Sequence, residues 1–231
     1  MKISPKLLHG KFIKRYKRFF VDINFNKKII VAHCPNSGSM LGLLDSGNNV
    51  WISKSDNKNR KLKFTLEIIN DKKSNVGVNT HRANRIVEES LINKKIKEIK
   101  NYNLLKREAK FTKETRFDFL LNNKNKKLFL EVKNVTLSRK KNISEFPDSV
   151  TARGKKHLVH LQKAIKKGYE SYLLFLIQRE DIKLMKIAED IDPDYFNEIK
   201  KAKKNGVKII AYSCNVNEKE ISVNKKIKVV I

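Results

Sequence analysis

Three residues near the middle of the chain, Asp118, Glu131 and Lys133, combine side-chain types that can act on a phosphodiester. Two carboxylates can hold Mg²⁺ or Mn²⁺ and orient a water molecule, and a lysine can act as a point charge or proton carrier. We therefore predict that Asp118 and Glu131 are metal ligands and that all three residues are catalytic. The alternative interpretation is a surface salt-bridge set formed by the two acids with Lys133 and Arg116.

The elements that must position these residues are two apolar runs, 116–121 and 128–133, joined by a polar connection rich in Asn and Lys. This pattern predicts a β-hairpin with a longer loop. A turn centred in the middle of the connection places Asp118 opposite Glu131. Directly opposed residues have Cβ atoms about 5 Å apart, so two carboxylates there require a cation between them. The same register opposes two cations, which is unfavourable unless the strands separate: Arg116 and Lys133.

The composition predicts a polyanionic partner. The 231 residues carry a formal net charge of +28, and both halves of the chain are basic. Each Lys or Arg near a phosphate releases counterions, so we expect nucleic acid, and DNA in particular, as the partner. Codon drift in an AT-rich genome is an alternative source of part of this charge.

The chain shows no pattern that predicts export or membrane insertion. The longest strongly apolar run, 172–177, is far too short to span a bilayer. Cys34 and Cys214 are far apart and unaccompanied, which argues against a disulfide framework. We expect a cytoplasmic protein without a membrane partner.

The first unit, 1–80, is predicted to be a small β-barrel. Its strands are expected at 12–25, 28–34, 49–55, 61–69 and 76–79, and an OB-type barrel is the first choice for a basic protein. The first strand interleaves cations with aromatic residues, as in surfaces that follow a nucleic-acid backbone and stack on bases. The predicted binding residues there are Lys14, Arg15, Tyr16, Lys17 and Arg18. The alternative is an amphipathic strand with Phe19 in the core and the lysines in solvent.

A polar turn at 33–40 contributes one more candidate, Asn36. Backbone N–H groups and Ser hydroxyls in such a turn can bind phosphate. A purely structural turn is the alternative, and a zinc site built on His33 and Cys34 lacks the four ligands with local spacing that zinc requires.

The second unit, 81–231, mixes helices and strands. Helices are expected at 82–93, at 150–167 and from Pro193, and strands at 104–111, in the hairpin, at 172–178, at 207–212 and, as an edge strand, at 226–231. Strands 172–178 and 207–212 flank a helix, which predicts a parallel pair. The helix at 150–167 presents a basic face, on which we predict nucleic-acid contacts by Arg153, Lys156 and His157.

This order of elements is similar to that of restriction-endonuclease-like folds, whose active-site pattern, PD-(D/E)XK, is an acid followed by Glu-x-Lys. The matching residues are Asp118, Glu131 and Lys133, with Phe117 where the pattern often has Pro. The resemblance implies a further glutamate from the first helix. Our catalytic candidate is Glu89, ahead of Glu88, and Glu108 on the preceding strand is a further alternative.

The whole sequence also resembles the sugar fermentation stimulation protein A family. The resemblance spans nearly the full length and is carried by segments 15–19, 33–40, 78–80 with 83–85, 116–119, 131–137, 146–151 and 153–158. It implies an N-terminal OB-type domain, a C-terminal nuclease-like domain, and DNA binding linked to regulation of sugar (maltose) catabolism. We therefore predict an α+β / α/β two-unit protein, an OB-type β-barrel followed by a restriction-endonuclease-like mixed-sheet domain.

Two function classes follow. The first is a Mg²⁺- or Mn²⁺-dependent nuclease that hydrolyses phosphodiesters in the second unit. The second is a non-catalytic DNA-binding regulator that uses the nuclease-like unit as a scaffold. A third hypothesis, an RNA-binding factor, predicts a preference for single-stranded or structured RNA.

Overall fold

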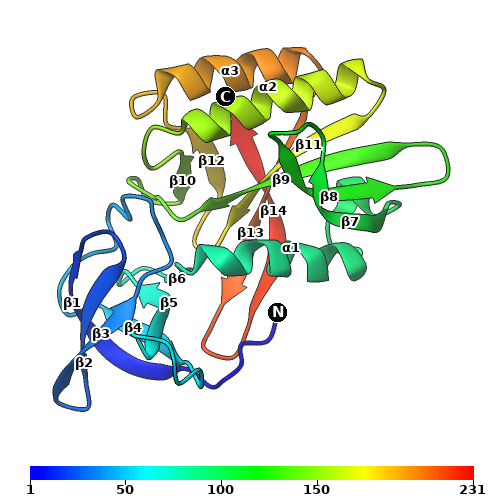
Figure 1. Cartoon of the computed structure of the whole chain (residues 1–231). Coiled ribbons are helices and arrows are strands. Elements are labelled where there is room, and N and C mark those ends of the chain that lie inside the picture. Colours follow the sequence, from blue (N-terminus) through cyan, green and yellow to red (C-terminus); the bar gives the residue numbers. More distant parts are fainter.

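The N-terminal part of the chain forms a closed β-barrel. A computed structural model describes all 231 residues, and the barrel lies beside a larger α/β unit (Figure 1). The strand order of the first sheet is β3-β2-β1-β4-β5-β6, and β3 also pairs with β5, which closes the barrel. The predicted OB-type barrel is confirmed. Its strands are β1 Leu8–Tyr16, β2 Phe20–Phe25, β3 Lys28–His33, β4 Asn49–Lys54, β5 Phe64–Asn70 and β6 Asn75–Gly77.

The predicted single strand at 12–25 is wrong, because the chain reverses direction within it. β1 and β2 are an antiparallel pair, and the turn between them contains Lys17 and Arg18 with φ of 47° and 60°. Left-handed backbone is uncommon in residues other than Gly, Asn and Asp. The turn contains no Gly, Pro or Asn, the residues that usually indicate a turn, so the sequence pattern did not reveal it.

The second unit is an eight-stranded mixed sheet with the order β10-β12-β14-β13-β11-β9-β8-β7. Helices α2 and α3 cover one face and α1 covers the other (Figure 1). The helices are α1 Ala83–Ile92, α2 Ala152–Lys166 and α3 Pro193–Lys204. The strands are β7 Asn103–Lys110, β8 Arg116–Asn122, β9 Lys127–Val135, β10 Ile143–Phe146, β11 Glu170–Ile177, β12 Leu184–Ile187, β13 Lys208–Val216 and β14 Ile221–Val230. Two 3₁₀ turns, Thr80–Arg82 and Lys97–Ile99, complete the chain.

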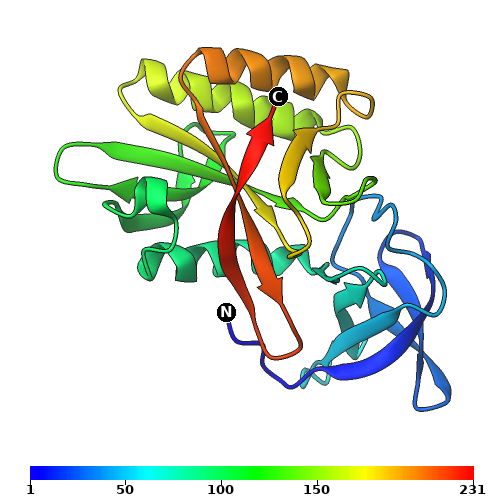
Figure 2. The ribbon, with the colours of Figure 1, turned by 180° about the vertical axis from the view of Figure 1, so that it is seen from behind.

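The strand pairing confirms one expectation and corrects another. β11 and β13 are parallel, as predicted from the intervening helix. The C-terminal strand β14 is not an edge strand, because it lies between β12 and β13 (Figure 2). The sheet continues through β12 and β10, which have only four residues each and were not predicted. Strands this short leave little alternation for a sequence pattern to reveal.

Two apolar layers hold the sheet to its helices. One layer packs α1 against the sheet and also takes Met1, Ile3 and Leu7 from the start of the chain. The other packs α2 and α3 against the opposite face. Each fully buried aliphatic or aromatic side chain contributes roughly 1.5–3 kcal/mol relative to its exposed state. The hairpin that carries the two acids is therefore held between two well-packed layers.

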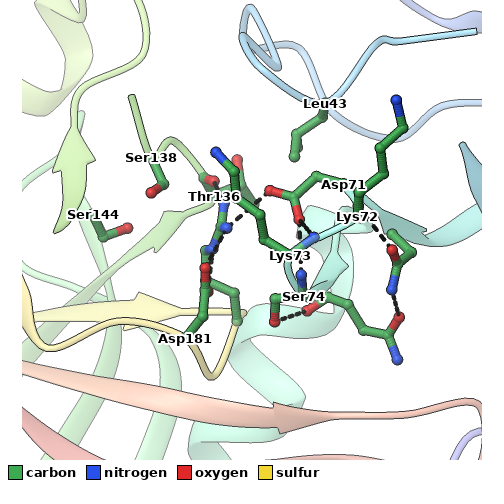
Figure 3. Close-up of polar contacts among 12 residues, drawn as sticks. Leu43, Asp71, Lys72, Lys73, Ser74, Thr136, Ser138, Ser144 and Asp181 are labelled. Atoms are coloured by element: carbon green, nitrogen blue, oxygen red, sulfur yellow. Dashed lines mark hydrogen bonds and ion pairs between the residues drawn. The ribbon is translucent and has the colours of Figure 1, made fainter. Parts of the chain in front are cut away.

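A buried ion-pair cluster joins the barrel to the second unit. Arg179 is 1% exposed and donates to Asp71 of the barrel at 2.9 Å and to Asp181 at 2.7 Å (Figure 3). Close by, the Gly77 N–H donates to the Gln178 carbonyl at 2.9 Å. A Cβ on Gly77 would lie 2.4 Å from Gln178 Oε1, so no larger residue fits this contact without movement. These contacts fix the barrel relative to the sheet.

The helices of the protein are too short or too polar to span a lipid bilayer.

Candidate active site

The hairpin has the predicted register, but its ladder stops before the two acids. The paired positions run from Asn122 and Lys127 to Phe119 and Leu130. The next pair would be Asp118 with Glu131, and it is absent from the ladder. The expectation that the two acids are directly opposed partners is therefore wrong. The ladder also ends before the predicted like-charge pair beyond them, Arg116 with Lys133.

Asp118 lies where the ladder between β8 and β9 ends. Its Oδ2 accepts a hydrogen bond from the backbone N–H of Val132 at 2.7 Å, and its Oδ1 accepts from Asn84 Nδ2 of α1 at 2.8 Å. Burial, and next the negative charge of Glu131, raise the pKa of Asp118 to about 6. Asp118 is thus held by two donors and is an unusually basic carboxylate, because it is buried and because a second acid lies beside it.

Glu131 is almost completely buried, with 3% of its surface exposed. Its Oε1 accepts from Lys133 Nζ at 2.7 Å and also contacts His157 Nδ1 of α2. Its Oε2 is buried and has no hydrogen-bond partner. Burial raises the pKa of Glu131, but the charge of Lys133 and the hydrogen bond with His157 outweigh burial and lower it below its ordinary value. Glu131 is therefore charged at neutral pH, with one oxygen unsatisfied.

These features fit a divalent cation. A buried carboxylate oxygen without a partner is costly, and a cation would satisfy it. The chain contains no group of three or more His, Cys, Asp and Glu residues that could hold a metal ion. Asp118 and Glu131 would thus supply two ligands, with water or phosphate oxygens completing the shell. Mg²⁺ commonly binds in this way, through one or two carboxylates and several waters.

Helix α1 contributes Asn84 rather than the predicted Glu89. Asn84 and Glu88 are four residues apart and share a helix face. Glu88 pairs with Arg107 of β7, which is opposite Phe119 in the strand ladder. Glu89 instead pairs with the terminal amine of Met1 at 2.9 Å, so the structure does not bring it to the two acids.

Asn84 was missed because an uncharged amide gives no chemical signal by itself. It lies inside the 83–85 motif that carries the family resemblance, and its helical spacing from Glu88 is the signal that could have found it. The alternative candidate Glu108 is exposed, has a φ of 44°, and lines a cavity with Arg153, Lys156 and His157, the last of which contacts Glu131.

The cations of the first hairpin divide into structural and exposed residues. The Arg15 guanidinium donates to four backbone carbonyls, those of Arg18, Asn36, Gly38 and Ser39, at 2.7–3.2 Å. It ties the turn at 36–39 to the hairpin and uses four of its five N–H donors there, which argues against our prediction that it contacts nucleic acid. Lys14 lies 3.7 Å from Asp22, and Tyr16 stacks on Phe20 with ring centroids 5.6 Å apart. Lys17 and Arg18 are exposed at the tip of the turn.

The three predicted contacts of α2 also differ from one another. Arg153 is exposed, and Lys156 is an exposed partner of Glu114 at 2.7 Å. His157 is buried and contacts Glu131, so it lies at the acidic site, and it lines one cavity with Arg153 and Lys156. Asn36 is buried as well and lines a cavity between the two units.

The fold and the site define a class of two-domain proteins in which an OB barrel is followed by a mixed-sheet domain that carries two neighbouring acids. The chain belongs to the sugar fermentation stimulation protein family. The model described as "Sugar fermentation stimulation protein RE domain" matches residues 81–220, and "SfsA N-terminal OB domain" matches residues 13–78.

Curated relatives align with the chain from end to end. A sugar fermentation stimulation protein homolog of Pelagibacter ubique is 55% identical over 100% of this chain and 99% of its own length. The homolog of Pseudoalteromonas atlantica is 41% identical, with 100% of both chains covered. Among solved structures, the one titled "The structure of Pyrococcus Furiosus SfsA in complex with Ca2+" has a TM-score of 0.89 at 22% identity, covering 100% of this chain and 98% of that chain. This last similarity concerns the fold.

Proposed function

We propose that the protein is a Mg²⁺- or Mn²⁺-dependent nuclease that binds DNA and hydrolyses a phosphodiester at Asp118 and Glu131. The observation that carries the proposal is the asymmetry of Glu131, whose Oε1 takes two donors while the buried Oε2 takes none. The raised pKa of Asp118, caused first by burial and next by the charge of Glu131, supports it, because a bound cation would favour the charged form of this carboxylate. A relative of the same fold has been solved in complex with Ca²⁺, another cation that prefers oxygen ligands.

The surrounding residues have distinct roles in this proposal. His157 and Lys133 hold the Glu131 carboxylate in one orientation, and Asn84 with the Val132 N–H does the same for Asp118. In this proposal the Lys133 ammonium group donates a hydrogen bond to a phosphate oxygen or to the attacking water. A bound Mg²⁺ or Mn²⁺ would supply positive charge at the phosphate and lower the pKa of the attacking water.

DNA is the proposed substrate because of the net charge of +28 and because exposed cations lie on both units. Lys17 and Arg18 extend from the barrel, and Arg153 lies on the first turn of α2. Non-specific DNA binding comes mainly from such contacts to phosphates.

Cleavage of labelled DNA and RNA by the pure protein with Mn²⁺ tests the proposal. We expect cleavage by the wild type, loss of cleavage in Asp118→Asn and Glu131→Gln, and retained cleavage in the matched control Asp56→Asn, which changes an exposed loop acid. Equal cleavage by wild type and Asp118→Asn would show that a contaminant or another site is responsible.

A second candidate function is a non-catalytic DNA-binding regulator. The ion pair between Lys133 and Glu131 at 2.7 Å favours it, because Lys133 already neutralises part of the charge that would attract a cation. This function predicts salt-dependent DNA binding, protection of particular promoters in footprints, and no cleavage with any divalent metal.

A further inference from the structure

A cavity of about 360 Å³ lies between the barrel and the second unit. The barrel lines it with Arg18 and the turn 36–38, and the second unit lines it with segments 134–137 and 145–151. Figures 1 and 2 both show the loop between β3 and β4 reaching from the barrel toward the β10 side of the sheet. The cavity is therefore formed by both units together.

Two deeply buried residues present polar groups without partners to this cavity. Asn36 is 4% exposed, and its Oδ1 accepts from the Gly38 N–H at 2.9 Å while its Nδ2 has no partner. Thr136 is 5% exposed, and its carbonyl accepts from Arg179 while its hydroxyl has no partner. Neither group is one of the fully buried side-chain atoms that lack a partner, so both are open to the cavity and can hydrogen-bond to a polar molecule that enters it.

The cavity also contains an acceptor that no cation neutralises. Asp148 forms no ion pair, and its only hydrogen bond is a long one of 3.5 Å from the Met40 N–H. A Cβ on Gly38 would lie 2.1 Å from Asp148 Oδ2, so the two units touch here and a larger residue would displace the Asp148 side chain. The second acid of the cavity, Glu145, is already paired with Arg139.

The polar groups of Asp148, Asn36 and Thr136 together favour a nucleobase over a phosphate as the ligand of this cavity. A phosphate offers only acceptors and would face the unpaired Asp148 carboxylate. A base edge offers N–H donors beside carbonyl or ring-nitrogen acceptors, which match Asp148 on one side and Asn36 Nδ2 and the Thr136 hydroxyl on the other. Phe146 and Pro147 supply an apolar wall, and the Arg18 guanidinium can stack on a ring.

The cavity is close enough to the acidic site to act on the same strand. Asn134 follows Lys133 on β9, and Thr151 at the cavity lies six residues before His157 on α2. Six helical residues span about 9 Å, which is roughly three nucleotide steps of a duplex strand. The turn that forms the barrel wall is held in place by Arg15.

We propose that this interdomain cavity receives an unpaired nucleobase, so that the protein selects nucleic acid with a bulged, flipped or single-stranded nucleotide over perfect duplex. The proposal rests on the nucleic-acid binding proposed above and specifies its substrate class. Taking a base out of the stack costs a few kcal/mol, least where the base is already unpaired.

The test measures binding in EDTA, so that cleavage plays no part. Three labelled duplexes share one sequence: fully paired, with a one-nucleotide bulge, and with the same bulge lacking its base. We expect the wild type to bind the base-containing bulge at least tenfold more tightly than the other two. Asp148→Asn and Thr136→Val should lose this preference and keep the affinity for paired duplex, whereas the matched control Asp56→Asn should keep both. The same set in RNA shows which nucleic acid supplies the base.

The outcomes separate the two proposals. Equal affinity for all three duplexes would overturn the cavity assignment and leave the proposed nuclease intact. A preference that the abasic bulge retains would also overturn it, because shape and not the base would then be read. Absence of binding to every duplex, in DNA and in RNA, would overturn both.

Discussion

The backbone N–H of Val132 on β9 donates to Asp118 Oδ2 on β8 at 2.7 Å. The acid therefore replaces the next backbone rung of a ladder that ends at Phe119 and Leu130. Because this bond ties the carboxylate to the neighbouring strand, the side chain is positioned by the sheet and not by a loop. Sites built on strands hold their geometry more precisely than sites built on loops.

Cation binding should strengthen as the pH rises through about 6. Asp118 has a pKa of about 6 because of burial and the charge of Glu131, so below this pH it is protonated and cannot act as a full ligand. Well below the pKa, affinity for Mn²⁺ should fall by about tenfold per pH unit. The affinity is measured from the EPR signal of free Mn²⁺, recorded between pH 5 and pH 7.5. A flat profile in the wild type would contradict the assignment of Asp118, and Asp118→Asn should bind weakly at every pH.

Asp118→Asn should stabilise the metal-free protein at neutral pH. The folded-state pKa of about 6 exceeds the ordinary value of 3.8, so the folded protein binds this proton more tightly than the unfolded chain. The contribution of the neutral acid is fully present below about pH 4 and is lost as the pH rises through 6. The shift corresponds to about 3 kcal/mol at pH 7.5. Asparagine has one acceptor oxygen for the two donors, so removing the charge should raise the free energy of unfolding by only about 1–2 kcal/mol.

Urea unfolding at pH 7.5 and at pH 4 measures this effect. The gain should disappear at pH 4, where the wild-type acid is already neutral. Asp56→Asn, at an exposed loop position, should change stability little at either pH. A loss of stability in Asp118→Asn at pH 7.5 would mean that the hydrogen bonds from Val132 and Asn84 outweigh the repulsion by Glu131.

The sequence was sufficient for the hairpin, the parallel β11–β13 pair and the barrel, because each depends on local periodicity and turn residues. It was insufficient where tertiary contacts decide. The partner of Glu89 is the terminal amine, and nothing local indicates that Met1 returns to α1. The contact of His157 with Glu131 depends on the packing of α2 against β9, which the position of His157 on a basic helix does not reveal.

Two arginines of the first hairpin should affect DNA binding differently. Arg18 is exposed at the turn, so Arg18→Ala should weaken binding and make the slope of log Kobs against log salt shallower by about 1. The Arg15 guanidinium donates hydrogen bonds to four backbone carbonyls of the hairpin and the turn at 36–39. Arg15→Ala removes these bonds and should therefore lower the melting temperature instead. Fluorescence anisotropy titrations at several salt concentrations, with thermal melts of each variant, separate the two effects. A shallower slope in Arg15→Ala with an unchanged melting temperature would reverse these assignments.

The ion pair between Arg179 and Asp71 should couple the stability of the barrel to that of the second unit. Both side chains are nearly inaccessible, at 1% and 6% exposed, and Arg179 also donates to the Thr136 carbonyl beside the interdomain cavity. Asp71→Asn keeps the shape, leaves Asp181 as a counter-ion, and should cost about 1–3 kcal/mol. Arg179→Met leaves the nearly inaccessible Asp71 and the partly exposed Asp181 without a cation and should cost about 3–5 kcal/mol. Urea unfolding followed by Trp51 fluorescence, which reports on the barrel, and by circular dichroism, which reports mainly on the second unit, measures both costs. The two probes should coincide in the wild type and separate in Arg179→Met, because the barrel then unfolds without the sheet. Coincident transitions in the variant would show that the remaining contacts, such as the one between Gly77 and Gln178, are enough to keep the two units cooperative.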